Sequence, residues 1–317
     1  MVDHSTPRAR GQGVSVPILC CPLCGSEALT LLFMVDAQRV ERCGSCSLVL
    51  LNPQPDCSDE QLYAEAYYRG DCAVKDRGQE NVLEPDRVAR RLESCRGVLE
   101  EIEGRLGRKG RLLDLGCGPG FLLKAAQDAG WVVAGADVSA FATAHARDRF
   151  GITQVTTGPL EDVEFPEASF DVVTLQHVIE HFRDPVRMVR RIKRWLAPGG
   201  LIWLETPDID SGRARREGPQ WSHMKVPEHL FYFNQRTLTR LLTGQGFTVL
   251  TAHREVEGTG LMQAACGGAE RARRFYEGAK RVPGFCAMVK VVRSANEFFR
   301  AGLQGESEII RLMARKA

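Results

Sequence analysis

A glycine-rich turn at residues 116–120 has residue types suited to binding a ligand. It follows the apolar run Leu112-Leu113-Asp114-Leu115 and reads Gly-Cys-Gly-Pro-Gly. Such a run predicts a buried parallel strand leading into a turn and a helix, where doubly wound α/β domains bind nucleotide-like cofactors. A dinucleotide site needs G-x-G-x-x-G, but here the third glycine comes one residue early and Pro119 lacks a backbone N–H. The turn therefore favours a cofactor other than a dinucleotide.

An acidic residue after the next predicted strand extends this site. Asp137 closes the run Ala134-Gly135-Ala136-Asp137, about twenty residues past the turn, where a carboxylate can accept hydrogen bonds from a ribose diol. A solvent-facing acid is the alternative. The candidate cofactor-binding residues lie at strand ends or in a helical segment before the core, and they are Asp114, Gly116, Gly118, Gly120, Asp137, Val138, Leu160, Gln176, Tyr67 and Tyr68.

Three histidines and a glutamate form a second group of candidate residues. The strand predicted over residues 170–176 leads into His177-Val178-Ile179-Glu180-His181, and His229 follows later in Pro-Glu-His. Histidine takes up a proton near neutrality, because its ordinary pKa is about 6.5. His181 and His229, and after them His177, are therefore candidate catalytic bases. H-x-x-E-H is also an inverted zinc-protease motif, but that motif needs a helix. A structural alternative is that His181 braces the loop before the next helix.

Two C-x-x-C pairs near the N-terminus have the spacing of a metal site. Eighteen residues separate the pair Cys21 and Cys24 from the pair Cys43 and Cys46, which lies inside the window of about 15–20 for four-cysteine zinc sites. Short apolar runs between and after the pairs suit the strands of a ribbon. Thiolates are soft ligands, so we expect a closed, structural zinc site. Cys20 lacks the x-x spacing to Cys24.

Composition narrows the class of protein and partner. The chain has 317 residues, of which 44% are hydrophobic, enough for one sizeable core and a smaller module. No apolar run has the length of a signal peptide at the N-terminus or the roughly 18 residues of a membrane span elsewhere. We expect a soluble, cytoplasmic protein with reduced thiols. A net charge of +2 favours neither nucleic acid nor a membrane as the partner, and sets no oligomeric state.

The remaining sequence predicts the elements that position these residues. Apolar runs alternate with helical repeats, as a doubly wound α/β sheet with crossover helices requires. The predicted strands cover residues 111–115, 131–137, 153–157, 170–176, 201–205, 247–253 and 308–316, seven in all, and predicted helices cover 121–129, 185–196 and 236–243. The expected domains are a flexible tail (1–13), a zinc ribbon (14–56), a helical lid or linker (57–109), the core (110–260), a helical insertion (261–304) and the final strand (305–317).

The predicted insertion is basic and amphipathic. A solvated face over a packed face explains such a pattern, and contact with an anionic membrane surface or a phosphorylated acceptor is the alternative.

Together, the glycine turn, the His-Val-Ile-Glu-His element, the Pro-Glu-His segment and the cysteine pairs resemble class I S-adenosylmethionine-dependent methyltransferases with an N-terminal zinc ribbon. The resemblance covers nearly the whole chain and implies a Rossmann-like fold with S-adenosylmethionine as cofactor. It implies that Asp114 braces the turn or attracts the cofactor's ammonium group, and that Tyr67 and Tyr68 belong to a lid, with ordinary aromatic packing as the alternative. Family members often carry an acid where Pro159 stands, so backbone groups, Glu161 or Asp162 would meet the adenine here.

A divalent ion is a further implication of the resemblance. Ubiquinone-biosynthesis O-methyltransferases and small-RNA 2′-O-methyltransferases carry a similar E-x-x-E-H that resembles a magnesium-binding element, in which His177 here replaces the first glutamate. His177, Glu180, His181 and His229 could hold such an ion. The loss of one carboxylate makes the set less suited to magnesium, so we favour catalysis without a metal.

The resemblance also implies a reaction, O-methylation of a small-molecule acceptor such as a sugar, a polyketide or a related metabolite. C- or N-methylation of a similar acceptor is the nearest alternative. Methylation of RNA and a non-catalytic scaffold that holds S-adenosylmethionine are two others, distinguished by steep salt dependence of binding and by indifference to loss of the histidines.

Overall fold

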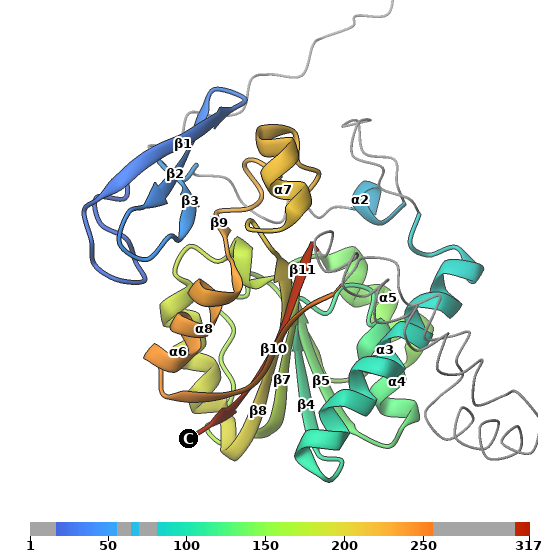
Figure 1. Ribbon diagram of the computed structural model, residues 1–317. Helices are drawn as coiled ribbons and strands as arrows, with labels where there is room; N and C mark the ends of the chain where they lie inside the picture. The colour runs from blue at the N-terminus through green and yellow to red at the C-terminus, as the bar shows by residue number, and fades with distance from the viewer. Residues whose placement is uncertain (1–16, 56–64, 70–80, 256–307) are drawn as a thin grey trace, which may run out of the picture.

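The computed structural model describes residues 17–55, 65–69, 81–255 and 308–317 (Figure 1). These residues form a seven-stranded sheet flanked by helices and a four-stranded sheet beside it. The predicted tail over residues 1–13 and the predicted insertion over 261–304 lie outside the described residues.

The central sheet has the strand order β10-β11-β8-β7-β4-β5-β6. From β4 the chain steps outward to β6 and then returns to β7 on the other side, so the order reverses between β4 and β7. The strands from β4 to β8 pair in parallel, whereas β11 runs antiparallel between β8 and β10. The strands are β4 (Arg111–Leu115), β5 (Val132–Asp137), β6 (Val155–Thr157), β7 (Phe170–Gln176), β8 (Leu196–Pro207), β10 (Phe247–Glu255) and β11 (Ile309–Lys316). The predicted doubly wound sheet of seven strands is confirmed.

Helices cover both faces of this sheet. Helices α3 (Pro85–Leu106), α4 (Phe121–Asp128) and α5 (Ala140–Phe150) lie on one face, and α6 (Pro185–Trp195) and α8 (Gln235–Gly244) lie on the other (Figure 1). Each face therefore has its own cluster of buried apolar side chains. The cap predicted from Asp184-Pro185 is present, because the Asp184 carboxylate accepts a hydrogen bond from Arg187 N at 2.8 Å. Within the described ranges, every helix is too short or too polar to cross a bilayer.

The N-terminal residues 17–55, which we call the cysteine module, form an antiparallel sheet of β1 (Leu29–Val35), β2 (Gln38–Cys43) and β3 (Val49–Leu51). A fourth strand, β9 (Phe231–Tyr232), comes from the core and pairs with β3. The buried side chains of β3 belong to the same apolar cluster as Leu113 and Leu175 of the central sheet. The sequence predicted a small separate ribbon, and the structure instead joins the module to the core through β9.

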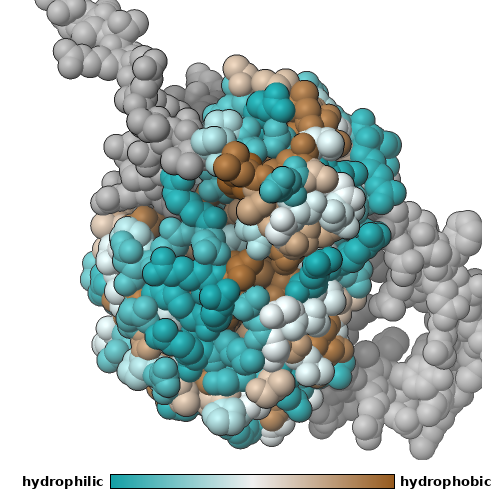
Figure 2. Space-filling model, turned by 90° about the vertical axis from the view of Figure 1, so that its left-hand side faces the viewer, coloured by the Kyte–Doolittle hydropathy of each residue, from teal (hydrophilic) through white to brown (hydrophobic). Residues whose placement is uncertain are grey.

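The outer side of the module differs from its inner side. The strand β1 lies at the edge of the four-stranded sheet, and large apolar side chains are exposed on the module, namely Leu19, Leu31 and Met34. Figure 2 shows apolar surface in the upper part of this side of the molecule. The inner strand β3 is fully buried, so packing against the core involves only one side of the module.

Candidate functional site

The candidate cofactor residues gather at one edge of the central sheet. The glycine turn follows β4, Val138 follows β5, Leu160 lies beyond β6 and Gln176 ends β7. Parallel strands present their carboxyl ends at the same edge, and the reversal of strand order between β4 and β7 leaves a crevice for ligands there. The structure therefore brings these sequence-predicted residues to a single edge.

Three glycines shape the turn in different ways. All have positive φ, at +70° for Gly116, +51° for Gly118 and +88° for Gly120. A Cβ at Gly116 would lie 2.3 Å from Val178 Cγ2, and one at Gly120 would lie 2.8 Å from Ala146 Cβ. At Gly118 the nearest atom would be Tyr68 Cε1 at 3.9 Å. The outer two glycines therefore permit close packing, whereas Gly118 faces space that a bound cofactor can use.

Asp137 ties the turn to the end of β5. Its Oδ2 accepts a hydrogen bond from Gly118 N at 2.7 Å, and its Oδ1 accepts one from Ser139 N at 2.8 Å. Burial raises the pKa of Asp137, and the two backbone donors oppose that shift. Each carboxylate oxygen has a further lone pair, so a ribose diol can donate to a side chain that the backbone already orients.

Tyr68 lies over the glycine turn. It belongs to α2 (Glu65–Arg69) and is 7% exposed. Its ring centroid is 5.1 Å from that of Tyr67 and 5.9 Å from that of Phe141. Burial raises the pKa of Tyr68 and the charge of Asp137 adds to the effect, so the phenol is neutral. The lid position is as the resemblance implies, and the ring contacts are those of the packing alternative, so Tyr68 satisfies both interpretations.

Asp114 is a buried carboxyl beneath the turn. Thr174 of β7 donates a hydrogen bond from Oγ1 to Asp114 Oδ1 at 2.7 Å, which braces β4 against β7. Burial raises the pKa of Asp114 to about 7, with the Thr174 bond opposing the shift and Asp137 adding to it. The carboxyl therefore changes charge near neutral pH, which matters for a ligand with a cationic group.

His177 begins the other half of the site. Its backbone has φ +53°, and its ring nitrogens lie 3.3 Å from Glu205 Oε1 and 3.6 Å from Glu180 Oε1. Burial disfavours the imidazolium, but the two carboxylates outweigh burial and raise the pKa of His177 to about 10. A ring protonated at neutral pH cannot accept a proton, so this arrangement does not favour His177 as a base.

Glu205 is a site residue that the sequence analysis missed. Besides His177 it contacts Arg311 of β11, whose Nε lies 2.5 Å from Glu205 Oε2. Burial disfavours the charged carboxylate, but His177 and Arg311 lower the pKa of Glu205 to about 2. An acid near the carboxyl end of a predicted parallel strand was a usable signal. Its arginine partner lies 106 residues away in the sequence, and no local pattern connects the two.

Glu180, His181 and His229 form a compact cluster. The short 3₁₀ helix η2 (Ile179–His181) carries the first two, and one ligand atom of each residue lies within 4.8 Å of the others. Thr206 donates a hydrogen bond to Glu180 Oε2 at 3.0 Å. Glu180 Oε1 and His229 Nδ1 are buried and, among the described residues, have no hydrogen-bond partner. Two such atoms beside a third donor fit a divalent cation. His177 lies outside this cluster, although the sequence analysis had included it.

The two histidines of this cluster can both be neutral. His181 Nδ1 lies 2.8 Å from the carbonyl oxygen of Glu228, so in the neutral ring Nδ1 carries the proton and Nε2 is the basic nitrogen. Burial lowers the pKa of His229 well below its ordinary value, and His181 adds to the effect. His229 is 4% exposed, whereas His181 is only partly buried, so His181 is the more accessible base.

The loop that carries His229 is held from both sides. Leu230 N donates to the carbonyl of Glu180 at 2.9 Å, which fixes the loop to η2. Leu51 N of the cysteine module donates to the carbonyl of Leu230 at 2.9 Å, and β3 then pairs with β9 directly after it. The position of His229 therefore depends on the module as well as on the core.

The four predicted cysteine ligands also meet. The Sγ atoms of Cys21 and Cys46 are 3.5 Å apart, as are those of Cys24 and Cys43, and all four lie within 4.8 Å of one another. The sulfur set and its closeness fit a tetrahedral metal site with no open position. Cys20 is exposed and lies outside the cluster.

Comparisons with known proteins agree with this geometry. A family model described as "Methyltransferase domain" matches residues 88–252. The chain is 32% identical over 152 residues to a "Probable S-adenosylmethionine-dependent methyltransferase" of Mycolicibacterium smegmatis, a match that covers 48% of this chain and 57% of that protein. A protein of the same description from Mycobacterium tuberculosis is 32% identical over 197 residues, covering 60% of this chain and 70% of that protein.

A third relative has a printed substrate. The "Ubiquinone biosynthesis O-methyltransferase" of Haemophilus ducreyi is 36% identical over 121 residues, covering 34% of this chain and 49% of that protein. The chain thus spans less than two thirds of the length of this relative and of the Mycolicibacterium protein. The family match covers more than half of the chain and includes the glycine turn, Asp137 and the Glu180–His181 element. The chain therefore belongs to the family of S-adenosylmethionine-dependent methyltransferases.

Proposed function

We propose that this protein transfers the methyl group of S-adenosylmethionine to a hydroxyl group of a small-molecule acceptor, such as a sugar, a polyketide or a related metabolite. The observation that carries the proposal is the meeting of two sets of residues at one sheet edge. The glycine turn and Asp137 suit the cofactor, and neutral His181 and His229 suit removal of a proton from the acceptor.

The cofactor would lie across the ends of β4 and β5. Backbone groups at Gly116 and Gly118 would approach its methionine part, and Asp137 would accept hydrogen bonds from its ribose. Asp114 would attract its ammonium group, and Tyr68 would cover it. Val138, Leu160 and Gln176 would line the remaining space. Glu161 already accepts a hydrogen bond from Arg183 N at 2.7 Å, so recognition of adenine would fall to backbone groups near Pro159 or to Asp162.

In the transfer step, the acceptor oxygen attacks the methyl carbon in line with the carbon–sulfur bond. The oxygen–carbon bond forms as the carbon–sulfur bond breaks, and sulfur keeps that electron pair to give S-adenosylhomocysteine. The proton of the hydroxyl moves to His181 Nε2, the more accessible basic nitrogen. The cofactor is already activated, so the protein mainly aligns the acceptor, excludes water and takes up this proton.

A divalent cation at Glu180, His181 and His229 is the second candidate for activating the acceptor. The two buried atoms without partners, Glu180 Oε1 and His229 Nδ1, favour it. When bound there, a cation would lower the pKa of an acceptor hydroxyl. One carboxylate and two imidazoles suit zinc, manganese or iron better than magnesium. We retain catalysis without a metal as the first proposal, because a neutral His181 needs no further group to accept a proton.

The four cysteines of the module would hold a structural zinc ion. The proposal rests on their spacing, on the approach of the four sulfur atoms and on the hydrogen bonds that tie the module to the His229 loop. A closed tetrahedral site would leave no position for the acceptor.

Calorimetry and elemental analysis test these proposals. We expect the purified protein to bind S-adenosylmethionine and S-adenosylhomocysteine but not NADH, and to contain one zinc ion per chain. Methyl transfer to a panel of hydroxylated metabolites should persist under a chelator that removes only weakly held cations. If activity is lost with the chelator and returns with manganese, the cation at Glu180, His181 and His229 replaces the metal-free mechanism. If the protein binds NADH instead of either sulfur compound, the proposed function is wrong.

A further inference from the structure

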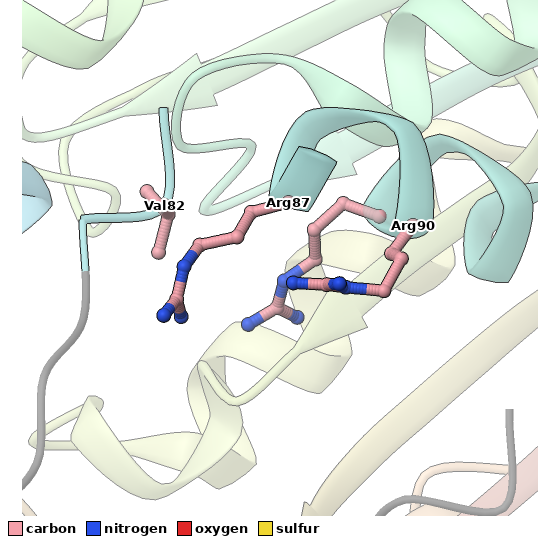
Figure 3. Close-up of a pocket in the computed structure, with 4 residues that line it drawn as sticks. Val82, Arg87 and Arg90 are labelled. Carbon is pink, nitrogen blue, oxygen red and sulfur yellow. The ribbon is translucent and has the colours of Figure 1, made fainter. Parts of the chain in front are cut away.

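A pocket lined by arginines lies at the N-terminal end of α3, apart from the residues assigned above. The cavity measures about 240 Å³ and is lined by Val82, Arg87, Arg90 and Arg91. Figure 3 shows the side chains of Arg87 and Arg90 extending from the first turns of α3 into the same space. Pockets for whole ligands usually measure about 300–1,000 Å³. A cavity of this size suits one group of a larger molecule.

The positive charge in this pocket is only partly compensated. Arg87 pairs with Glu84, with 3.3 Å between Nε and Oε2. Arg90 and Arg91 make no hydrogen bond or ion pair with another residue in the described part of the chain. Further along the same helix, Arg96 does have a partner, because its Nη1 lies 2.5 Å from Glu93 Oε2. The arginines of α3 therefore differ, and those without carboxylate partners are in the pocket.

The pocket borders the candidate active site. On one side, Val82 N donates a hydrogen bond to the carbonyl of Tyr68 at 3.1 Å, and Tyr68 lies over the glycine turn. On the other side, Cys95 lies one turn beyond Arg91 on α3. Burial raises the pKa of the Cys95 thiol to about 12, and the nearby carboxylates of Asp114 and Glu205 add to that shift. The first turns of α3 therefore lie close to the carboxyl ends of β4 and β8.

We propose that this arginine pocket binds a phosphate group carried by the acceptor. The inference rests on the proposed function, because it assigns the pocket to the molecule that receives the methyl group. Guanidinium groups bind phosphate oxygens through paired hydrogen bonds, and the N-terminal turn of a long helix favours an anion. Two guanidinium groups without carboxylate partners suit a group with at least two negative charges, which a phosphate monoester or a diphosphate has and a carboxylate lacks.

The carboxylate of the cofactor's methionine part is the competing occupant. The pocket lies beside the glycine turn through Tyr68, so an arginine there could reach that carboxylate instead. The two occupants differ in which ligand loses affinity when the arginines are removed. They also differ in whether the pocket stays available once S-adenosylhomocysteine is bound.

Isothermal titration of the full chain with inorganic pyrophosphate tests the proposal. The variants are Arg90→Gln with Arg91→Gln together, each single substitution, and Arg96→Gln as a matched control on the same helix. We expect pyrophosphate to bind the wild type equally well with and without saturating S-adenosylhomocysteine. The double variant should lose at least about tenfold in pyrophosphate affinity and each single variant severalfold, because two charged contacts are removed. Arg96→Gln should bind pyrophosphate as the wild type does, and the affinity of every variant for S-adenosylhomocysteine should change by less than about twofold.

Several outcomes would overturn the proposal. It is wrong if pyrophosphate does not bind the wild type, if the double variant binds it equally well, or if malonate binds as tightly as pyrophosphate. If the double variant loses affinity for S-adenosylhomocysteine, the arginines hold the cofactor carboxylate instead. A wild type that binds pyrophosphate but not S-adenosylhomocysteine would remove the proposed function and, with it, the assignment of the pocket to an acceptor. Thermal melts of each variant show whether the side chains, which are exposed at Arg90 and Arg91, were removed without loss of the fold.

Discussion

The cysteine cluster and the Glu180–His181–His229 cluster both gather possible metal ligands, but they are built differently. The four cysteines come from two turns of one small module, and a tetrahedral site would use every sulfur atom. The second cluster joins η2 to a loop 47 residues further along the chain, and His181 in it is only partly buried. A closed set of identical ligands suits structure, whereas a mixed and partly open set suits chemistry.

The two clusters are also connected. The strand β3 of the module pairs with β9, and Leu51 N donates to the carbonyl of Leu230, the residue after His229. Loss of the closed site should therefore disturb the open one, whereas loss of the open site should leave the closed one intact. This asymmetry leads to the predictions below.

Replacement of Cys43 by Ser should have the largest effect. We expect the variant to lose its zinc, to lose amide protection at Leu51 and Leu230, and to lose methyl transfer by more than about 100-fold, because His229 is no longer held in place. Elemental analysis, hydrogen exchange and a transfer assay measure the three effects. Cys20→Ser is the matched control, since that thiol is exposed and outside the cluster. A zinc-free Cys43→Ser protein that keeps protection at Leu51 would break the proposed connection.

Replacement of His181 by Ala should affect chemistry without affecting the module. Removal of a catalytic base typically costs about 10²- to 10⁴-fold in rate, so kcat should fall in that range while zinc content and affinity for S-adenosylhomocysteine stay unchanged. His253→Ala, on β10, is the control. Unchanged kcat in His181→Ala would leave this histidine as a brace for the loop and shift the role of base to His229.

The same contrast between closed and open arrangements explains what the sequence could predict. The strands of the central sheet followed from apolar runs, and the glycine turn and Asp137 followed from spacing, because each signal is local. The cysteine cluster also followed from spacing. The pairing of β3 with β9 and the bond between Glu205 and Arg311 join segments far apart in the sequence, so only the folded chain reveals them. The charge of His177 likewise depends on Glu205, which the sequence analysis had not placed in the site.

Two glycines of the turn offer a smaller-scale test of the contrast. Gly120→Ala should lower the free energy of unfolding by about 2–3 kcal/mol, because a Cβ would lie 2.8 Å from Ala146 Cβ and φ is +88°. Gly118→Ala should cost about 1–2 kcal/mol, from the positive φ alone, but should lower affinity for S-adenosylhomocysteine by roughly tenfold, since the methyl group enters the open side of the turn. Thermal melts and calorimetry of both variants separate packing from binding. Equal losses of affinity would show that Gly118 does not face the cofactor.

The smallest effect should come from the charge of Asp114, and its sign can be worked out. Burial raises the pKa of Asp114 to about 7, so in the free protein the carboxyl is largely protonated at pH 6 and largely ionised at pH 8. A cationic ammonium group binds the ionised form better, so affinity for S-adenosylhomocysteine should rise as pH increases from 6 to 8, by at most about tenfold per unit below the pKa.

Asp114→Asn should abolish this rise and bind more weakly at pH 8, because the amide keeps an oxygen for Thr174 Oγ1 but has no charge. Calorimetry across the pH range measures both effects. Asp137, whose pKa burial also raises, is retained in the variant and serves as the internal control. A slope that survives in Asp114→Asn would assign the titration to Asp137 and leave Asp114 with only its bracing role between β4 and β7.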